Sequence, residues 1–215
     1  MTIKLNENYK PEDHPKLYLS QKAENFEAIF TLLKIAPVHQ LDQIYSLFKK
    51  LPVNPSLKSK FLTLDSVKSA ESPEQKQLAW NELLDPSCFY HLLFCLSIVN
   101  STIQKDPAYS HLFIEAGGLK QLLQCILHLN IQVIDSMLKL KCLKDLTALT
   151  LSLLAIDSSV IQQVDSQAFL KRVLCLAELL CDFSIRQETQ RGYTYEHLQN
   201  KIKQEGQKKY LARLH

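Results

Sequence analysis

The sequence predicts an all-α fold, and its composition is the first reason. The chain has 215 residues, with 39 leucines but only four glycines and eight prolines. This usage favours helices and does not suit a β-sandwich, which needs many glycine-rich turns. With 46% hydrophobic and 22% charged residues, the composition also excludes a collagen-like or disordered chain. A chain of this length buries roughly 70% of the surface that its unfolded form exposes, so we expect a sizeable core.

The second reason is hydrophobic periodicity, which begins after a polar segment. Residues 1–18 carry prolines among polar residues and no apolar period, so we predict a flexible leader there. From about Ser20 the apolar residues recur with helical spacing until just before Pro37, and they do so again over 41–51. Proline suits the first position of a helix, so Pro55 predicts the start of a third, short helix reaching residue 64.

The clearest helix start is Ser72-Pro73-Glu74-Gln75. It combines a hydroxyl cap, a proline at the first helical position and a glutamine placed to reach back to a free amide. The helix it begins ends before Pro86. The next segment, 88–103, is apolar nearly all round, which is typical of a helix in the middle of a bundle or solenoid.

The third reason is a glycine pair at a helix corner. Gly117-Gly118 follows a short predicted helix over 107–115, and glycine can take the left-handed conformation that closes a helix. Leucine-striped segments then predict helices over 119–127, from 130 or 135 to 156, over 159–164, over 165–185 and over 194–214.

These elements add up to roughly nine to eleven helices joined by short connectors, without a convincing strand. The sharp glycine corner between a short and a longer helix favours an irregular armadillo/HEAT-like α-solenoid of about ten helices. A compact orthogonal bundle is the alternative that periodicity leaves open. We expect three parts: a leader (1–18), an armadillo-like domain (19–185) and a basic C-terminal helix (186–215).

The net charge of +3 is unevenly distributed. Residues 186–215 carry seven Lys or Arg and three Glu, which gives +4, whereas the remaining 18 basic and 19 acidic residues give −1. The tail fits a solvated or packing helix, a helix that docks on a partner, or, less well, a contact for nucleic acid or lipid. The candidate partner contacts are Lys201, Lys203, Lys208 and Lys209.

The six cysteines do not describe a disulfide scaffold, because the chain is long and shows no secretory leader. We expect reduced thiols in core positions. Cys88, His91 and Cys95 share a helical face, but a structural zinc needs a fourth ligand and the segment is strongly apolar, so core packing is favoured over metal binding. No cysteine has the polar or glycine-bearing turn of a catalytic nucleophile, and Gly117-Gly118 lacks a phosphate-loop context.

We therefore expect no catalytic residue, no metal, no cofactor and no small-molecule substrate. The longest apolar run, Phe89 to Val99, is far too short to span a membrane. These features predict a protein of the cytoplasm, or also of the nucleus, whose partners are other proteins.

A series of short motifs, in order and spacing, resembles the helical region that precedes the protease domain in very large ubiquitin-specific proteases of the fat-facets type. The resemblance covers about Ile44 to Leu129. Its elements are Leu51-Pro52 with Asn54-Pro55, Trp80-Asn81-Glu82-Leu83-Leu84, Tyr90-His91-Leu92-Leu93-Phe94-Cys95-Leu96-Ser97-Ile98-Val99, and Phe113-Ile114-Glu115-Ala116-Gly117-Gly118-Leu119-Lys120-Gln121-Leu122-Leu123.

The resemblance implies an armadillo-like arm that recruits substrates and partners for a cytosolic deubiquitinase. The cysteine box of that family, of the form G-x-x-N-x-G-N-x-C, does not occur here, and no histidine lies in a matching box. No catalytic residue carries over, so we expect a non-catalytic scaffold for protein–protein interaction. The alternative function is an armadillo-like regulator of the formin or engulfment type that binds a small GTPase.

Overall fold

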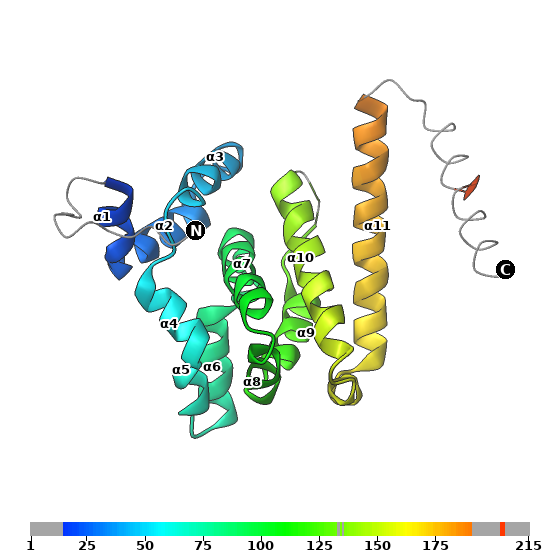
Figure 1. Ribbon diagram of the computed structural model, residues 1–215. Helices are drawn as coiled ribbons and strands as arrows, with labels where there is room; N and C mark the ends of the chain where they lie inside the picture. The colour runs from blue at the N-terminus through cyan, green and yellow to red at the C-terminus, as the bar shows by residue number, and fades with distance from the viewer. Residues whose placement is uncertain (1–14, 133, 135, 191–202, 205–215) are drawn as a thin grey trace. The chain divides into compact units, whose positions relative to one another are not determined.

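The computed structural model describes residues 15–132, 134, 136–190 and 203–204. These residues form eleven α-helices and a short 3₁₀ helix, with no strand among them, so the all-α class is confirmed (Figure 1). The α-helices are α1 (Pro15–Gln21), α2 (Ala23–Ile35), α3 (Val38–Phe48), α4 (Pro55–Thr63), α5 (Asp65–Lys68), α6 (Pro73–Leu83), α7 (Phe89–Lys105), α8 (Tyr109–Glu115), α9 (Gly118–His128), α10 (Met137–Leu154) and α11 (Ser166–Gln190).

The chain divides into two compact units. Unit 1 comprises Met1–Asn130 with Ser136–Ser166, and unit 2 comprises Ile131–Asp135 with Gln167–His215. Helix α1 begins at Pro15, inside the segment predicted as a leader, and the division after residue 166 falls inside the range 19–185 that we expected to be one domain. Neither observation decides where the three predicted parts begin and end, so these boundaries stay predictions.

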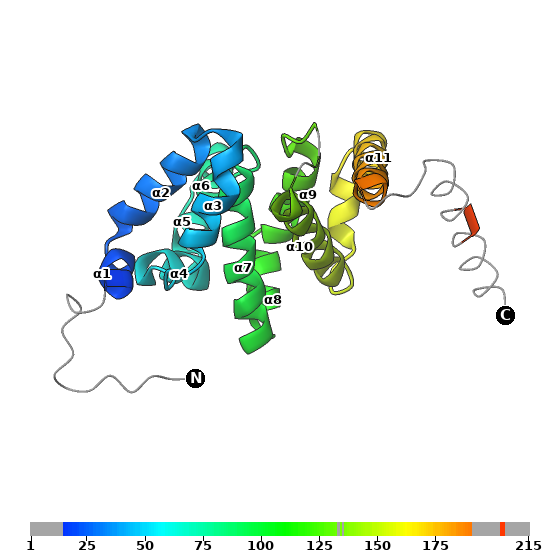
Figure 2. The same cartoon turned by 90° about the horizontal axis from the view of Figure 1, so that it is seen from above.

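Helix α7 occupies the middle of unit 1. It packs against α2, α4, α8 and α10, and both views show it between α2 and α10 (Figures 1 and 2). Ten of its 17 residues are buried. The sequence prediction of a central helix is thus confirmed, and the reason is that α7 has neighbours on several sides and needs apolar residues toward each of them.

Caps and prolines define the starts of α4 and α6 as predicted. The hydroxyl of Ser72 accepts a hydrogen bond from the Gln75 amide at 3.2 Å, and Pro73 is the first residue of α6. The Gln75 side chain reaches back, but it accepts from the amide of Glu71 (3.0 Å) rather than from that of Ser72. The capping box therefore satisfies an amide one residue earlier than its usual form.

The glycine corner between α8 and α9 also matches the prediction. Gly117 has φ of +94°, in the left-handed region that favours glycine. Gly118 lies against Phe113, so that a Cβ added to Gly118 would collide with the phenyl ring. One glycine thus provides the turn and the other the close packing.

In unit 2, helix α11 differs from its prediction in which side chains it buries. Arg186 connects α11 to Ile134, which lies before α10 in the sequence and belongs to the same unit. Its guanidinium donates a hydrogen bond of 2.9 Å to the carbonyl of Ile134. The buried hydrophobic residues of α11 are Leu176 and Phe183. Cys175 and Cys181 are exposed, so the prediction that all six cysteines are core positions was wrong for these two. The helix carries leucine around much of its circumference, and such a pattern does not select one buried face.

Candidate functional site

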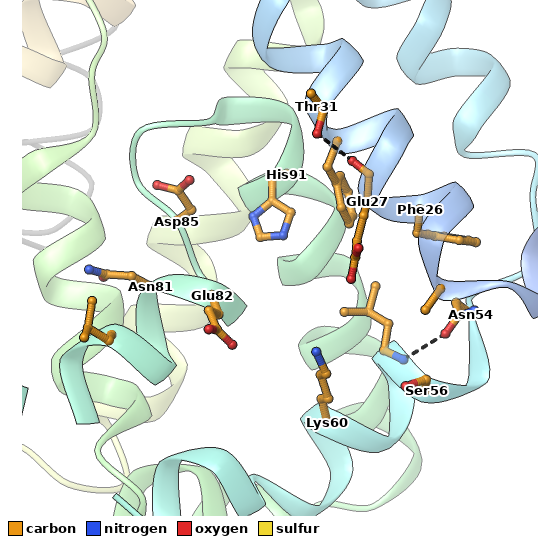
Figure 3. Close-up of a pocket in the computed structure, with 14 residues that line it drawn as sticks. Phe26, Glu27, Thr31, Asn54, Ser56, Lys60, Asn81, Glu82, Asp85 and His91 are labelled. Atoms are coloured by element: carbon orange, nitrogen blue, oxygen red, sulfur yellow. Dashed lines mark hydrogen bonds between the residues drawn. The ribbon is translucent and has the colours of Figure 1, made fainter. Parts of the chain in front are cut away.

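A pocket of about 740 Å³ opens in unit 1 between α2, α4, α6 and the start of α7 (Figure 3). Four segments that are separate in the sequence contribute to it. Phe26, Phe30 and His91 supply aromatic rings, whereas Glu27, Lys60 and Glu82 supply charges. The pocket therefore combines an apolar floor with a charged rim, an arrangement typical of binding sites.

The floor belongs to an aromatic cluster that holds its shape. Phe30 stands edge-on to His91, with ring centroids 4.4 Å apart and planes at 89°. The ring centroid of Phe48 lies 5.2 Å from that of Phe30, 5.1 Å from that of Phe26 and 4.4 Å from that of Phe94. Phe30–His91, Phe30–Phe48 and Phe26–Phe48 are edge-to-face pairs, which stabilise a packed core beyond the burial of their area. The floor is therefore continuous with the aromatic core.

The rim carries three carboxylates and one ammonium group. Glu27 on α2, Glu82 on α6 and Lys60 on α4 are exposed, and Asp85 is half-buried in the loop after α6. The Asp85 carboxylate is held in place, because one of its oxygens accepts from the amide (2.8 Å) and the hydroxyl (2.6 Å) of Ser87. The formal charge of this rim is therefore −2, from three acidic groups and one basic group.

Asn54 positions the α4 side of the pocket. Its side chain is buried, accepts a hydrogen bond from the Leu57 amide at 3.1 Å and donates one to the carbonyl of Ser20 at 2.7 Å. The first bond caps α4 and the second ties α4 to the end of α1. One residue thus fixes the position of two helices relative to each other.

His91 and Cys95, which the sequence places on one helical face, are in contact. The Cys95 sulfur lies 3.5 Å from His91 Nε2, and both side chains are buried. Burial raises the pKa of the Cys95 thiol well above its ordinary value, and the nearby Cys88 and Asp85 act in the same direction. This thiol is therefore protonated at neutral pH and is poor as a nucleophile or metal ligand. No group of three potential metal ligands is found among the described residues.

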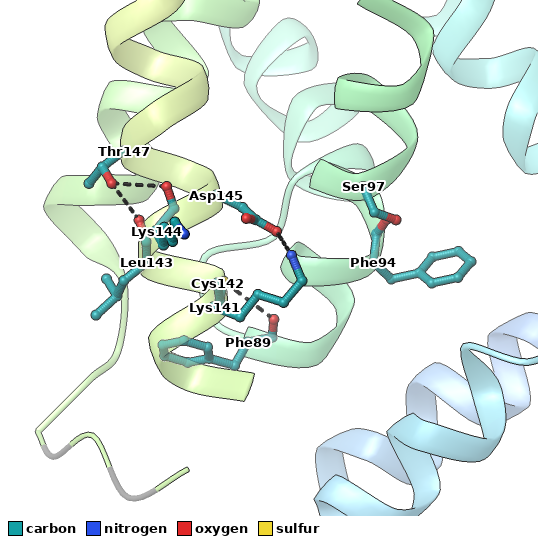
Figure 4. A network of polar contacts seen from close by, with 9 residues as sticks. All are labelled: Phe89, Phe94, Ser97, Lys141, Cys142, Leu143, Lys144, Asp145 and Thr147. Atoms are coloured by element: carbon teal, nitrogen blue, oxygen red, sulfur yellow. Dashed lines mark hydrogen bonds and ion pairs between the residues drawn. The ribbon is translucent and has the colours of Figure 1, made fainter. Parts of the chain in front are cut away.

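The contact between α7 and α10 holds another buried thiol (Figure 4). The Cys142 thiol donates to the carbonyl of Phe89 at 3.8 Å, and Lys141 forms an ion pair with Asp145 one helical turn away. Burial, with smaller contributions from Cys125 and Asp145, raises the pKa of Cys142. The contact between Cys142 and Phe89 joins α10 to α7, whereas the ion pair lies within α10.

A second pocket, of about 760 Å³, lies against α4, α7 and α8. Lys58 and Lys105 line it together with Ile98 and Tyr109. The phenol of Tyr109 donates to the carbonyl of Phe61, and burial raises its pKa. Tyr109 therefore has a structural role here, and the rim of this pocket differs in charge from that of the first.

The candidate partner contacts of the basic tail fall mostly outside the described residues. Lys203 is described and exposed. Lys201, Lys208 and Lys209 are not among the described residues, so their role stays a prediction.

None of the helices in the described ranges is long and apolar enough to span a membrane.

Comparison with family models, with curated proteins and with solved structures found no match.

Sequence reasoning did not identify the rim of the first pocket. Phe26 and Phe30 belong to the apolar helical pattern that runs from about Ser20 to Pro37, and Asp85 directly precedes Pro86, where a predicted helix ends. Neither pattern indicates a site. Glu27 carried no signal, because it is an ordinary exposed residue of an amphipathic helix. Glu82 lies within one of the motifs that carry the resemblance, and this was the only sequence feature that singled out a residue of the rim.

Proposed function

We propose that this chain is a non-catalytic helical scaffold that binds other proteins. The observation that carries the proposal is the open pocket between α2, α4, α6 and α7, where an aromatic floor meets exposed charges contributed by three helices. Exposed charges around an apolar centre are typical of protein recognition sites.

The architecture we propose is an irregular armadillo/HEAT-like α-solenoid, in which successive helices stack through their leucine stripes. The motifs over 44–129 further suggest kinship with the partner-recruiting arm of a large deubiquitinase, acting in the cytoplasm or the nucleus. Under this proposal the chain recruits partners in the ubiquitin pathway and leaves any chemistry to another domain.

Site-directed photo-crosslinking in cells tests the binding role. A photoreactive amino acid at Ser56, an exposed residue of the pocket, should form discrete adducts with proteins. The matched control places the same group at Gln40, which is exposed on α3 and outside the pocket. Equal adduct patterns at the two positions would contradict a binding site in this pocket.

A second measurement separates the scaffold from an enzyme. Incubation with ubiquitin carrying a C-terminal vinyl electrophile should leave the chain unmodified. The buried thiols are protonated and do not attack it, and the exposed Cys175 and Cys181 lie on α11 rather than in the polar or glycine-bearing turn of a catalytic cysteine. A covalent ubiquitin adduct would assign a deubiquitinase activity to the chain. A small GTPase among the Ser56 adducts, bound in one nucleotide state only, would establish the GTPase-regulator alternative instead.

A further inference from the structure

We propose that the pocket between α2, α4, α6 and α7 binds an arginine side chain on an extended segment of a partner protein. This inference rests on the proposed scaffold function and names the chemistry of its partner. It depends on two properties of the pocket: the charge of its rim and the aromatic rings of its floor.

The charge of the rim favours a cationic ligand. Glu27 and Glu82 come from two different helices and line one cavity together with Asp85 of the loop after α6, and Lys60 is the basic residue among those that line it. Carboxylates at the edge of a cavity attract a cation. A ligand with one or two positive charges therefore complements the formal charge of −2.

The aromatic floor favours arginine over lysine. Phe30 is half-buried and lines the cavity beside His91, whose ring stands perpendicular to it. A planar guanidinium group can lie on an aromatic ring and donate hydrogen bonds to carboxylates at its edge at the same time. The ammonium group of lysine is a compact point charge and does not combine these contacts as well.

Replacing Lys60 tests the proposal, because the binding of an arginine-containing segment and that of an acidic segment should change in opposite directions. Lys60 lies on α4 at the edge of the cavity, and its ammonium group repels a cationic ligand. Lys60→Gln should therefore tighten the binding of an arginine-containing segment. It would weaken the binding of an acidic segment, so one variant distinguishes the two kinds of occupant.

The experiment measures fluorescence anisotropy of labelled peptide pools on the full chain. Each pool is a hexapeptide with one fixed central residue and a mixture of Ala, Gly, Leu and Ser elsewhere. The fixed residue is arginine, lysine, glutamate or citrulline, the neutral analogue of arginine. The arginine pool should bind best, and binding should weaken as the salt concentration rises.

A pair of double variants tests the site itself. Glu27→Gln with Glu82→Gln removes two charges from the pocket and should weaken arginine-pool binding by about tenfold or more, since charge-assisted hydrogen bonds are lost. The matched control, Glu24→Gln with Glu71→Gln, removes two exposed charges outside the pocket, one on α2 and one just before the cap of α6. The control should bind as the wild type does, and thermal melting should show that both variants stay folded.

Three results would overturn the proposal: equal loss of binding in both double variants, equal binding of the arginine and citrulline pools, or weaker arginine-pool binding in Lys60→Gln. No binding of any pool, with protein adducts still formed at Ser56, would reject arginine and retain the scaffold function. Absence of both signals would reject the function as well, so the two failures are distinguishable.

Discussion

The side-chain amide of Gln121 on α9 donates a hydrogen bond of 3.0 Å to the carbonyl of Leu84, the residue that closes α6. Both residues are buried. Gln121 also accepts from Gln77 at 2.9 Å and donates to Asn81 at 3.2 Å. Carbonyls at the end of a helix have no partner within it, so this glutamine satisfies one of them and joins α6 to α9.

Replacing Gln121 by leucine should destabilise the fold. The carbonyl of Leu84 would be left with the weaker thiol donor of Cys125, at 3.5 Å. A buried acceptor that loses its main partner costs about 1–3 kcal/mol, and urea unfolding measures this loss. Gln124→Leu on the same helix is the control, because Gln124 contacts His128 on the exposed surface and should change stability by about 0.5 kcal/mol or less. Equal effects of the two changes would contradict a structural role for Gln121.

Gly118→Ala should be coupled energetically to Phe113. The new methyl group would collide with the Phe113 ring, so the loss of stability should shrink when Phe113 is replaced by leucine. A double-mutant cycle followed by thermal melting should give a coupling of about 0.5–3 kcal/mol. Gly117→Ala is the control: its positive φ makes alanine unfavourable by roughly 1 kcal/mol, but the methyl group has room and should show no coupling to Phe113. A cycle without coupling at Gly118 would show that the ring moves away freely.

Asn54 should have two separable effects. In Asn54→Ser the hydroxyl can still cap α4, but it is too short to reach the carbonyl of Ser20, which accepts from Asn54 at 2.7 Å. Hydrogen exchange should then accelerate in α1 while the first amides of α4 stay protected. Asn54→Ala should accelerate exchange in both helices and cost about 1 kcal/mol more, the usual loss of a cap. Unchanged exchange of α1 in both variants would show that Asn54 does not hold that helix.

The buried thiols should make stability fall at alkaline pH. Burial, followed by the Asp85 charge, raises the pKa of Cys125 from 9.0 to about 12. Between these values the folded chain retains a proton that the unfolded chain releases, so the free energy of unfolding decreases as the pH rises. One such thiol contributes up to about 1.4 kcal/mol per pH unit, and nothing below pH 9.

Urea unfolding across this range measures the effect. Cys125→Ala should give a shallower pH dependence than the wild type, whatever its effect at neutral pH. Cys175→Ala should leave the dependence unchanged, because Cys175 is exposed. Parallel pH profiles for all three proteins would contradict the raised pKa of Cys125.

Helix starts and the central helix could be predicted because their causes are local. Ser72 with Pro73, Pro55, and the glycine pair impose backbone geometry on their immediate neighbours. Helix α5 was not predicted, since it depends on Leu64, a non-glycine residue with φ of +54°. Its side chain is fully buried, and tertiary packing of that side chain offsets a backbone conformation that leucine alone would avoid.

The sequence by itself determined that this protein is helical, where most helices begin and end, and that the apolar segment 88–103 forms a central helix. Composition, period and capping are properties of neighbouring residues, so they can be read without coordinates. Only the tertiary structure decided that Glu27, Lys60, Glu82 and Asp85 surround one aromatic-floored pocket, and that two cysteines of α11 are exposed. Both facts depend on which helix faces meet, and this is set by packing between segments that are distant in the chain.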